Sequence, residues 1–199
     1  MREISPALNL SVDDYFANIR SSKARQFIVS IREQKLAGTC PLPSTTVVDC
    51  SAILTKSIRA NLLDRIAILV DENIFGRHEI CEQFADLLHR SLTLLGIPAR
   101  AVLGTAIYFS NDREVFCWDH AWIRVGDEVI DGNVDTLFEN HLAPPFLRIA
   151  PYWGPIKRTP KDRRLVQNKR LVFPVSDTDV NNVISLYIRA KGFNYVLLI

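Results

Sequence analysis

The sequence predicts an α+β domain, in which helices come first and a run of antiparallel strands follows. Apolar residues recur at helical spacing as far as residue 95, whereas β-branched and aromatic runs separated by turn residues occupy positions 99–134. The chain has 199 residues, of which 48% are hydrophobic and 23% charged, and this balance is typical of a folded domain. We therefore expect a single domain over residues 1–199, with a helical N-terminal part at 1–75 packed on the sheet.

Two helical regions are expected in that N-terminal part. Ser11 and the acids that follow it form a typical helix start, and the helical spacing of apolar residues continues to about Leu36. Ser44 or Thr45 then caps a second helical region, which residues 62–70 either continue or follow as a separate helix.

Three strands are expected after the helices, at Ala99–Phe109, Val115–Val125 and Glu128–Val134. Residues 110–112 link the first two strands. Gly126–Asp127 is a two-residue hairpin turn, so it pairs the second strand with the third. These strands belong to a core at residues 76–140.

A basic segment runs from Arg148 to Arg170 and contains eight basic residues and one acid. This composition favours a solvated loop, and the alternative is a rim that binds an acidic peptide or another polyanion. Tyr152 and Trp153 lie within it, but no recognition motif predicts binding to nucleic acid. The segment opens a C-terminal part at residues 141–199.

The end of that C-terminal part contains one further helix and one further strand. The helix is expected from Ser176 to about Lys191, and residues 193–199 are expected to form a closing strand. The net charge of +2 does not by itself indicate a nucleic-acid partner. The sequence specifies no oligomeric state.

The chain is expected to be cytoplasmic. No stretch approaches the ~20 apolar residues of a membrane span, and the charged N-terminal segment lacks the apolar core of a secretory signal. The four cysteines are therefore expected to be free thiols. Cys40 and Cys50 are assigned structural roles.

Cys81 is the candidate nucleophile. A helix begins near Glu79, because apolar residues recur at helical spacing from there, and Gly96 and Pro98 end it. Cys81 then lies in the first turn, where unpaired backbone N–H groups and the positive end of the helix dipole favour a thiolate. The backbone N–H of Cys81 also offers one donor to an oxyanion.

His120 is the candidate base. Strand alternation places Phe116, Trp118, His120 and Trp122 on one face, so the imidazole is surrounded by aromatic rings and partly desolvated. Trp118 and Trp122 are expected to contact the substrate. Cys117 and His120 lie three residues apart on a strand and therefore face opposite sides, so no metal site is expected.

The third strand supplies the orienting group. If Gly126–Asp127 forms the turn, Asn133 lies opposite His120, and Asp131 is its diagonal neighbour on the same face. Residues in these positions lie roughly 5–8 Å apart, which a carboxylate or an amide can span. Asp131 or Asn133 can therefore hold the imidazole tautomer, although a three-residue turn would place Asp131 on the other face.

In order and spacing, these residues resemble the transglutaminase-like superfamily of cysteine enzymes. The resemblance rests on Cys81, Gly96–Arg100, His120–Trp122 and Val129–Asp131, and it covers about residues 76–135. That family is similar to papain in its core, with the nucleophile at the start of a helix and the histidine and aspartate on adjacent antiparallel strands. The cysteine and the His-Ala-Trp sequence are also similar to processing proteases of lasso-peptide pathways, which lack the long flanks of this chain.

The resemblance implies that Cys81 is the nucleophile, His120 the base and then the acid, and Asp131 the orienting carboxylate. It implies attack on an amide carbonyl of a peptide or protein, a thioester intermediate, and no cofactor. Transglutaminases are similar around a Gly-Gln-Cys-Trp motif, whereas this chain has Glu79–Glu82, with an acid in place of the tryptophan. Hydrolysis of an amide bond is therefore favoured over protein crosslinking.

Two alternatives to hydrolysis stay open. The first is acyl transfer to an amine, which uses the same thioester. The second is a non-catalytic interaction module that retains the fold and binds its partner through the basic segment, at Lys157, Arg158, Arg163 and Arg164.

Overall fold

The computed structural model describes residues 54–73, 81–140 and 142–170, together with Thr46–Val47 and isolated positions between 26 and 39. The positions described between 26 and 34 are helical, in agreement with the first predicted helix. The predicted helix start at Ser11, the helix at 176–191 and the strand at 193–199 lie outside the described residues. Within the part of the chain that is described, no helix is long and apolar enough to cross a membrane.

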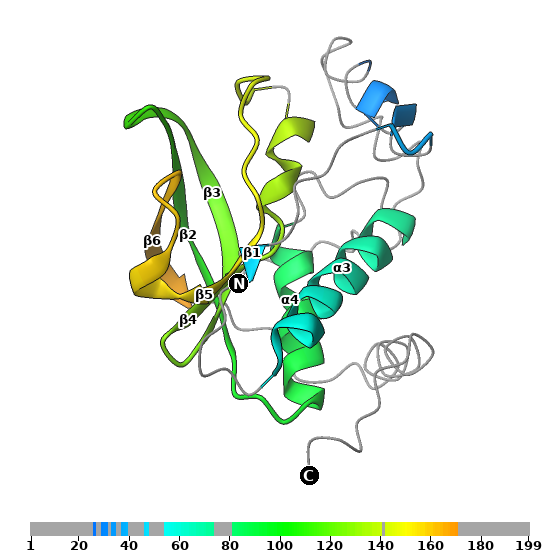
Figure 1. The fold of residues 1–199 in the computed structure, drawn as a ribbon, viewed down its shortest axis with the longest axis vertical. Coiled ribbons are helices and arrows are strands. Elements are labelled where there is room, and N and C mark those ends of the chain that lie inside the picture. Colours follow the sequence, from blue (N-terminus) through cyan, green and yellow to red (C-terminus); the bar gives the residue numbers. More distant parts are fainter. Residues whose placement is uncertain are drawn as a thin grey trace.

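The fold is α+β, as predicted, and is built on one six-stranded sheet with the strand order β1-β5-β4-β3-β2-β6. The strands β2 to β6 pair antiparallel, whereas β1 joins β5 in parallel. The helices α3 (Lys56–Asn73) and α4 (Cys81–Leu94) lie side by side against one face of the sheet (Figure 1). The strand bounds are β1 Thr46–Val47, β2 Arg100–Ser110, β3 Arg113–Val125, β4 Glu128–Asp131, β5 Tyr152–Pro155 and β6 Arg163–Arg170.

The predicted end of α4 at Gly96 is confirmed. Gly96 has a φ of 71°, which a residue with a side chain rarely adopts. The N–H of Ile97 donates to the carbonyl of Leu92 over 2.9 Å, and the N–H of Gly96 donates to Thr93 over 3.0 Å. This pair of bonds satisfies the last carbonyls of the helix and turns the chain directly into β2.

The predicted hairpin between β3 and β4 is also confirmed. Val125 pairs with Glu128 across the two-residue turn, and the register continues to Ile123 opposite Ile130. The β4 ladder ends at Asp131, three residues earlier than predicted, and the short 3-10 helix η2 follows at Val134–Glu139. The register that the candidate site requires is therefore present.

Two parts of the predicted secondary structure are wrong. Thr46–Val47 forms the edge strand β1 rather than part of a second helix, and α3 is one continuous helix that begins only at Lys56. The basic segment contains the strands β5 and β6 rather than a solvated loop. All three strands are short or polar and pair with strands distant in sequence, so their local sequence carries little strand signal.

The sheet buries apolar residues on both of its faces. One cluster lies between the sheet and the two helices, and includes Leu63, Phe84, Leu88, Ile123 and Ile130. The opposite face is covered by the segment that follows β4, through Val134, Leu137, Leu147 and Ile149, which pack on Ala106 and Tyr108 of β2. His120 and Asp131 point to this second face, because their strand neighbours Ala121 and Ile130 face the helices.

Candidate active site

Cys81 is the first residue of α4, and its side chain is half-buried. Its position at the helix N-terminus is the predicted one, among backbone N–H groups that have no partner within the helix. The first turn of α4 approaches the end of β4 closely: a Cβ at Gly132 would lie 2.7 Å from Cε1 of Phe84. The lack of a side chain at Gly132 thus brings Cys81 up to the strand that carries Asp131.

His120 lies in the middle of β3 opposite Gly104 and is fully buried. Its ring stacks on Trp118, with ring centroids 5.4 Å apart and an interplanar angle of 13°. Trp122 lies on the other side, at 6.3 Å between centroids and 34°. The predicted aromatic surroundings of the imidazole are therefore present, and they fix the plane of the ring.

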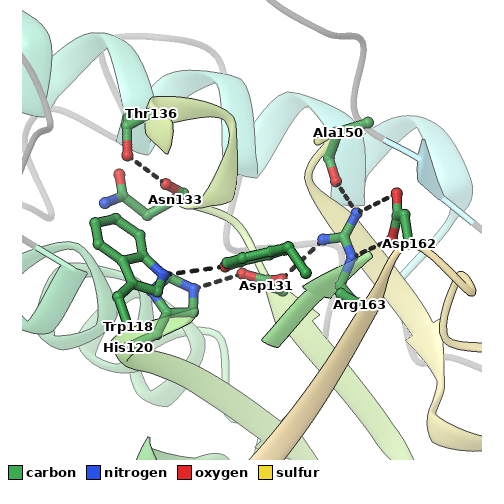
Figure 2. Close-up of polar contacts among 9 residues, drawn as sticks. Trp118, His120, Asp131, Asn133, Thr136, Ala150, Asp162 and Arg163 are labelled. Atoms are coloured by element: carbon green, nitrogen blue, oxygen red, sulfur yellow. Dashed lines mark hydrogen bonds and ion pairs between the residues drawn. The ribbon is translucent and has the colours of Figure 1, made fainter. Parts of the chain in front are cut away.

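Asp131 contacts His120 directly. Its Oδ1 lies 2.7 Å from Nε2 of His120, and both side chains are fully buried (Figure 2). Of the two orienting groups that the sequence left open, Asp131 makes this contact. Asn133 lies beyond the end of β4, where its backbone carbonyl accepts a hydrogen bond of 2.7 Å from the Thr136 hydroxyl.

Cys81 and His120 interact electrostatically. Burial lowers the pKa of His120, but the charge and hydrogen bond of Asp131 and the interaction with Cys81 raise it, so that the pKa reaches about 9 instead of 6.5. Among the described residues, none makes a hydrogen bond of regular geometry with the buried Nδ1 of His120.

Arg163 of β6 is a member of the site that the sequence reasoning missed. Its Nη1 donates to Oδ2 of Asp131 over 2.8 Å, and its guanidinium also contacts Asp162 and the Ala150 carbonyl (Figure 2). Burial raises the pKa of Asp131, but the neighbouring His120 and Arg163 lower it more strongly, so the carboxyl ionises below its usual 3.8. The predicted role of Arg163 as a surface charge is wrong, because only 5% of the residue is exposed.

Tyr108 of β2 was also missed. It is fully buried, and its hydroxyl oxygen accepts a hydrogen bond of 3.1 Å from Nε1 of Trp118. Burial and the nearby charge of Asp131 raise the pKa of Tyr108 well above 10, so the phenol stays neutral. The Tyr108–Trp118 bond holds the indole that stacks on His120. The sequence carries one signal for this role: strand alternation places Tyr108 on one face of β2 and Trp118 on one face of β3. That signal shows that the two side chains meet only once the pairing of β2 with β3 is known.

The two tryptophans that were expected to contact the substrate differ in exposure. Trp122 is 3% exposed and packs in the core with Val102, Val129 and Tyr152. It therefore has no surface to offer to a substrate, and its predicted role is wrong. Trp118 is half-buried, and its contact with the substrate stays a prediction.

The remaining candidates do not form a second site. Within the described ranges, no group of three or more His, Cys, Asp or Glu residues is arranged to hold a metal ion. Cys117 is an exposed free thiol on β3. Cys40 and Cys50, which were assigned structural roles, lie outside the described residues.

Comparison of the chain with known proteins found no matching family model, no matching curated protein and no matching solved structure.

Proposed function

We propose that this chain is a cysteine-dependent hydrolase of amide bonds in a peptide or protein, with a papain-like core formed by α4 and the strands β2 to β4. The observation that carries the proposal is the hydrogen bond of 2.7 Å between His120 and Asp131, beside a cysteine that begins a helix. A buried imidazole with a carboxylate on one nitrogen and a thiol near the other is the arrangement that activates a cysteine nucleophile.

The reaction would begin with transfer of the Cys81 proton to His120. Because Nε2 is bound to Asp131, the nitrogen left to accept that proton is Nδ1. A pKa of about 9 for His120 favours the imidazolium at neutral pH, which places a positive charge beside the Cys81 sulfur. The pair would thus be ready for attack before the substrate arrives.

In the first half of the reaction, the sulfur of Cys81 forms a bond to the carbonyl carbon of the substrate. The backbone N–H groups at the start of α4 are donors for the oxyanion that develops. The C–N bond then breaks, and His120 gives its proton from Nδ1 to the leaving amine, so a thioester remains on Cys81. In the second half, water loses a proton to His120 and attacks the thioester, which releases the carboxylic acid and restores the thiolate.

The two cysteines that the structure describes provide a test. Cys117 is exposed and Cys81 only half-buried, so exposure alone predicts faster alkylation of Cys117. If His120 activates Cys81 as proposed, Cys81 should nevertheless react with limiting iodoacetamide about ten times faster than Cys117. Mass spectrometry of the two tryptic peptides measures the ratio. Preferential labelling of Cys117 would contradict the proposal.

Two variants sharpen this test. His120→Gln should abolish the preference for Cys81, whereas Cys117→Ser should leave the labelling of Cys81 unchanged. Turnover is then sought with a library of fluorogenic peptide and isopeptide substrates, where Cys81→Ala should remove all cleavage. Incorporation of a labelled primary amine in place of hydrolysis would favour acyl transfer.

One of the four basic residues that the non-catalytic interaction module would use to bind its partner is buried. Arg163 is buried against Asp131 and is unavailable to a partner, whereas Arg158 and Arg164 are exposed. If the interaction module is correct, charge reversal at Arg158 and Arg164 abolishes the biological effect and Cys81→Ala retains it. The hydrolase proposal expects the opposite result.

A further inference from the structure

The carboxylate of Asp131 has a cation on each of its two oxygens. His120 Nε2 lies 2.7 Å from Oδ1, and Arg163 Nη1 lies 2.8 Å from Oδ2. The side chains of the ion pair with Arg163 are 0% and 1% exposed. A buried carboxylate without compensating charge strongly favours its neutral form, so these two cations are what keeps it ionised.

The two cations differ in whether they keep their positive charge. The imidazole of His120 loses its charge whenever it gives up a proton, and in the proposed reaction it does so in every cycle. The guanidinium of Arg163 remains charged at every pH at which the protein is folded. When His120 is neutral, Arg163 is therefore the only positive charge in contact with the Asp131 carboxylate among the described residues.

Arg163 is itself fixed on its other sides. Its Nε donates to Oδ1 of Asp162 over 2.9 Å, and its Nη2 donates to the Ala150 carbonyl over 2.5 Å (Figure 2). The backbone of Arg163 lies in β6, where it pairs with Tyr108 of β2. A planar fork held at three points can present Nη1 to Asp131 in only one orientation, which an ammonium group on a lysine cannot reproduce.

We propose that Arg163 is a positioning residue of this site: it holds the Asp131 carboxylate ionised and directed at Nε2 of His120 whether or not the imidazole carries a proton. The other titratable groups that act on this cluster are Tyr108 of β2, Cys81 of α4 and Asp162, which precedes β6. Tyr108 stays neutral, and Asp162 compensates the charge of Arg163 from the solvent side. The effect of Arg163 on catalysis rests on the proposed function, but its effect on Asp131 does not.

The test measures the two ionisations directly, by NMR titration of the Asp131 carboxyl carbon and the His120 ring in the full chain. Arg163→Gln keeps a hydrogen-bond donor and removes the charge, so the pKa of Asp131 should rise by about 1–3 units. Arg163→Lys keeps the charge and removes the fork, so that pKa should stay low. Arg164→Gln removes the same charge from an exposed neighbour and should leave both titrations unchanged. An unchanged Asp131 titration in Arg163→Gln, or an equal shift in Arg164→Gln, would overturn the inference.

A measurement on the unmutated chain covers the case in which Arg163→Gln fails to fold. A guanidinium held at three points should give resolved N–H signals from Arg163 that exchange slowly with solvent, and these signals should broaden as Asp131 becomes protonated in acid. Rapidly exchanging signals at neutral pH would count against the inference. If Cys81 proves unreactive while the titrations behave as expected, the proposed function fails and the role of Arg163 stands.

Discussion

Asp131 is the residue on which most of the site depends. It is buried on the face of the sheet opposite the two helices, yet it joins β4 to His120 of β3 and to Arg163 of β6. The charge of Asp131 is also the largest of the effects that raise the pKa of His120. One carboxylate thus sets both the orientation and the protonation of the imidazole.

Replacement of that carboxylate should reverse the shift of His120. In Asp131→Asn the burial of the ring remains and lowers the pKa, while the charge that opposes it is gone, so the pKa of His120 should fall from about 9 to its usual 6.5 or below. NMR titration of the His120 ring measures this change. The control is Asp119→Asn, which removes an exposed carboxylate from the adjacent position on the other side of β3. If both variants titrate alike, the assignment of Asp131 is wrong.

Whether a residue of the site could be predicted depends on how far apart in the sequence the interacting segments lie. Cys81 and His120 could be predicted, because a helix start and the alternation of a strand are local patterns. Asp131 followed from the two-residue turn at Gly126, which fixed the β3–β4 register. Arg163 could not be predicted, because its contact depends on the pairing of β6 with β2 across more than fifty residues.

At the scale of elements, the close pairing of β2 with β6 is what brings Arg163 into the site. The approach is tight at Gly104, where a Cβ would lie 2.1 Å from the backbone oxygen of Val166 and 2.5 Å from Cη2 of Trp122. Neither atom can move away alone, since one is strand backbone and the other is part of a buried ring. A side chain at position 104 would therefore separate the two strands.

Gly104→Ala should accordingly lower the free energy of unfolding by about 1–3 kcal/mol, the usual cost of overpacking. It should also perturb the guanidinium signals of Arg163, because β6 has to shift. Gly126→Ala is the matched control: its Cβ would meet nothing within 4 Å, and its φ of 54° costs about 1–2 kcal/mol of local strain. Urea unfolding measures the loss of stability in both variants, and only Gly104→Ala should perturb the NMR signals of Arg163. Unperturbed Arg163 signals in Gly104→Ala would show that β6 tolerates the added methyl group.

At the scale of the whole molecule, the buried charged residues connect strands that lie far apart in the sequence. His120, Asp131 and Arg163 lie on three strands, and all three are nearly or fully buried. Charges of this kind stabilise a fold only while each remains paired, since removal of one partner leaves the other uncompensated in the interior. The stability of the protein should therefore depend on pH at both ends of the range.

The pH dependence has a definite sign at each end. Asp131 has a native pKa below the 3.8 of an unfolded chain, so its contribution is present above about pH 4 and is lost in stronger acid. His120 has a native pKa of about 9 against 6.5, so its contribution is complete below pH 6.5. Between 6.5 and 9 the native state binds more protons than the unfolded state, and the free energy of unfolding falls as the pH rises.

We therefore expect the combined contribution of Asp131 and His120 to the free energy of unfolding to be greatest between about pH 4 and 6.5, and the contribution of His120 to fall by roughly 3 kcal/mol between pH 6.5 and 9. Urea unfolding at several pH values measures this slope. His120→Gln should be less stable overall but should lose most of the decline above pH 6.5, because glutamine does not titrate. Both proteins carry Cys81→Ser, which removes the thiol that interacts with His120, so the difference between the two slopes isolates His120. Parallel slopes would mean that Asp131 does not hold His120 in its protonated form. The proposal that an imidazolium activates Cys81 before the substrate binds would then have no physical basis.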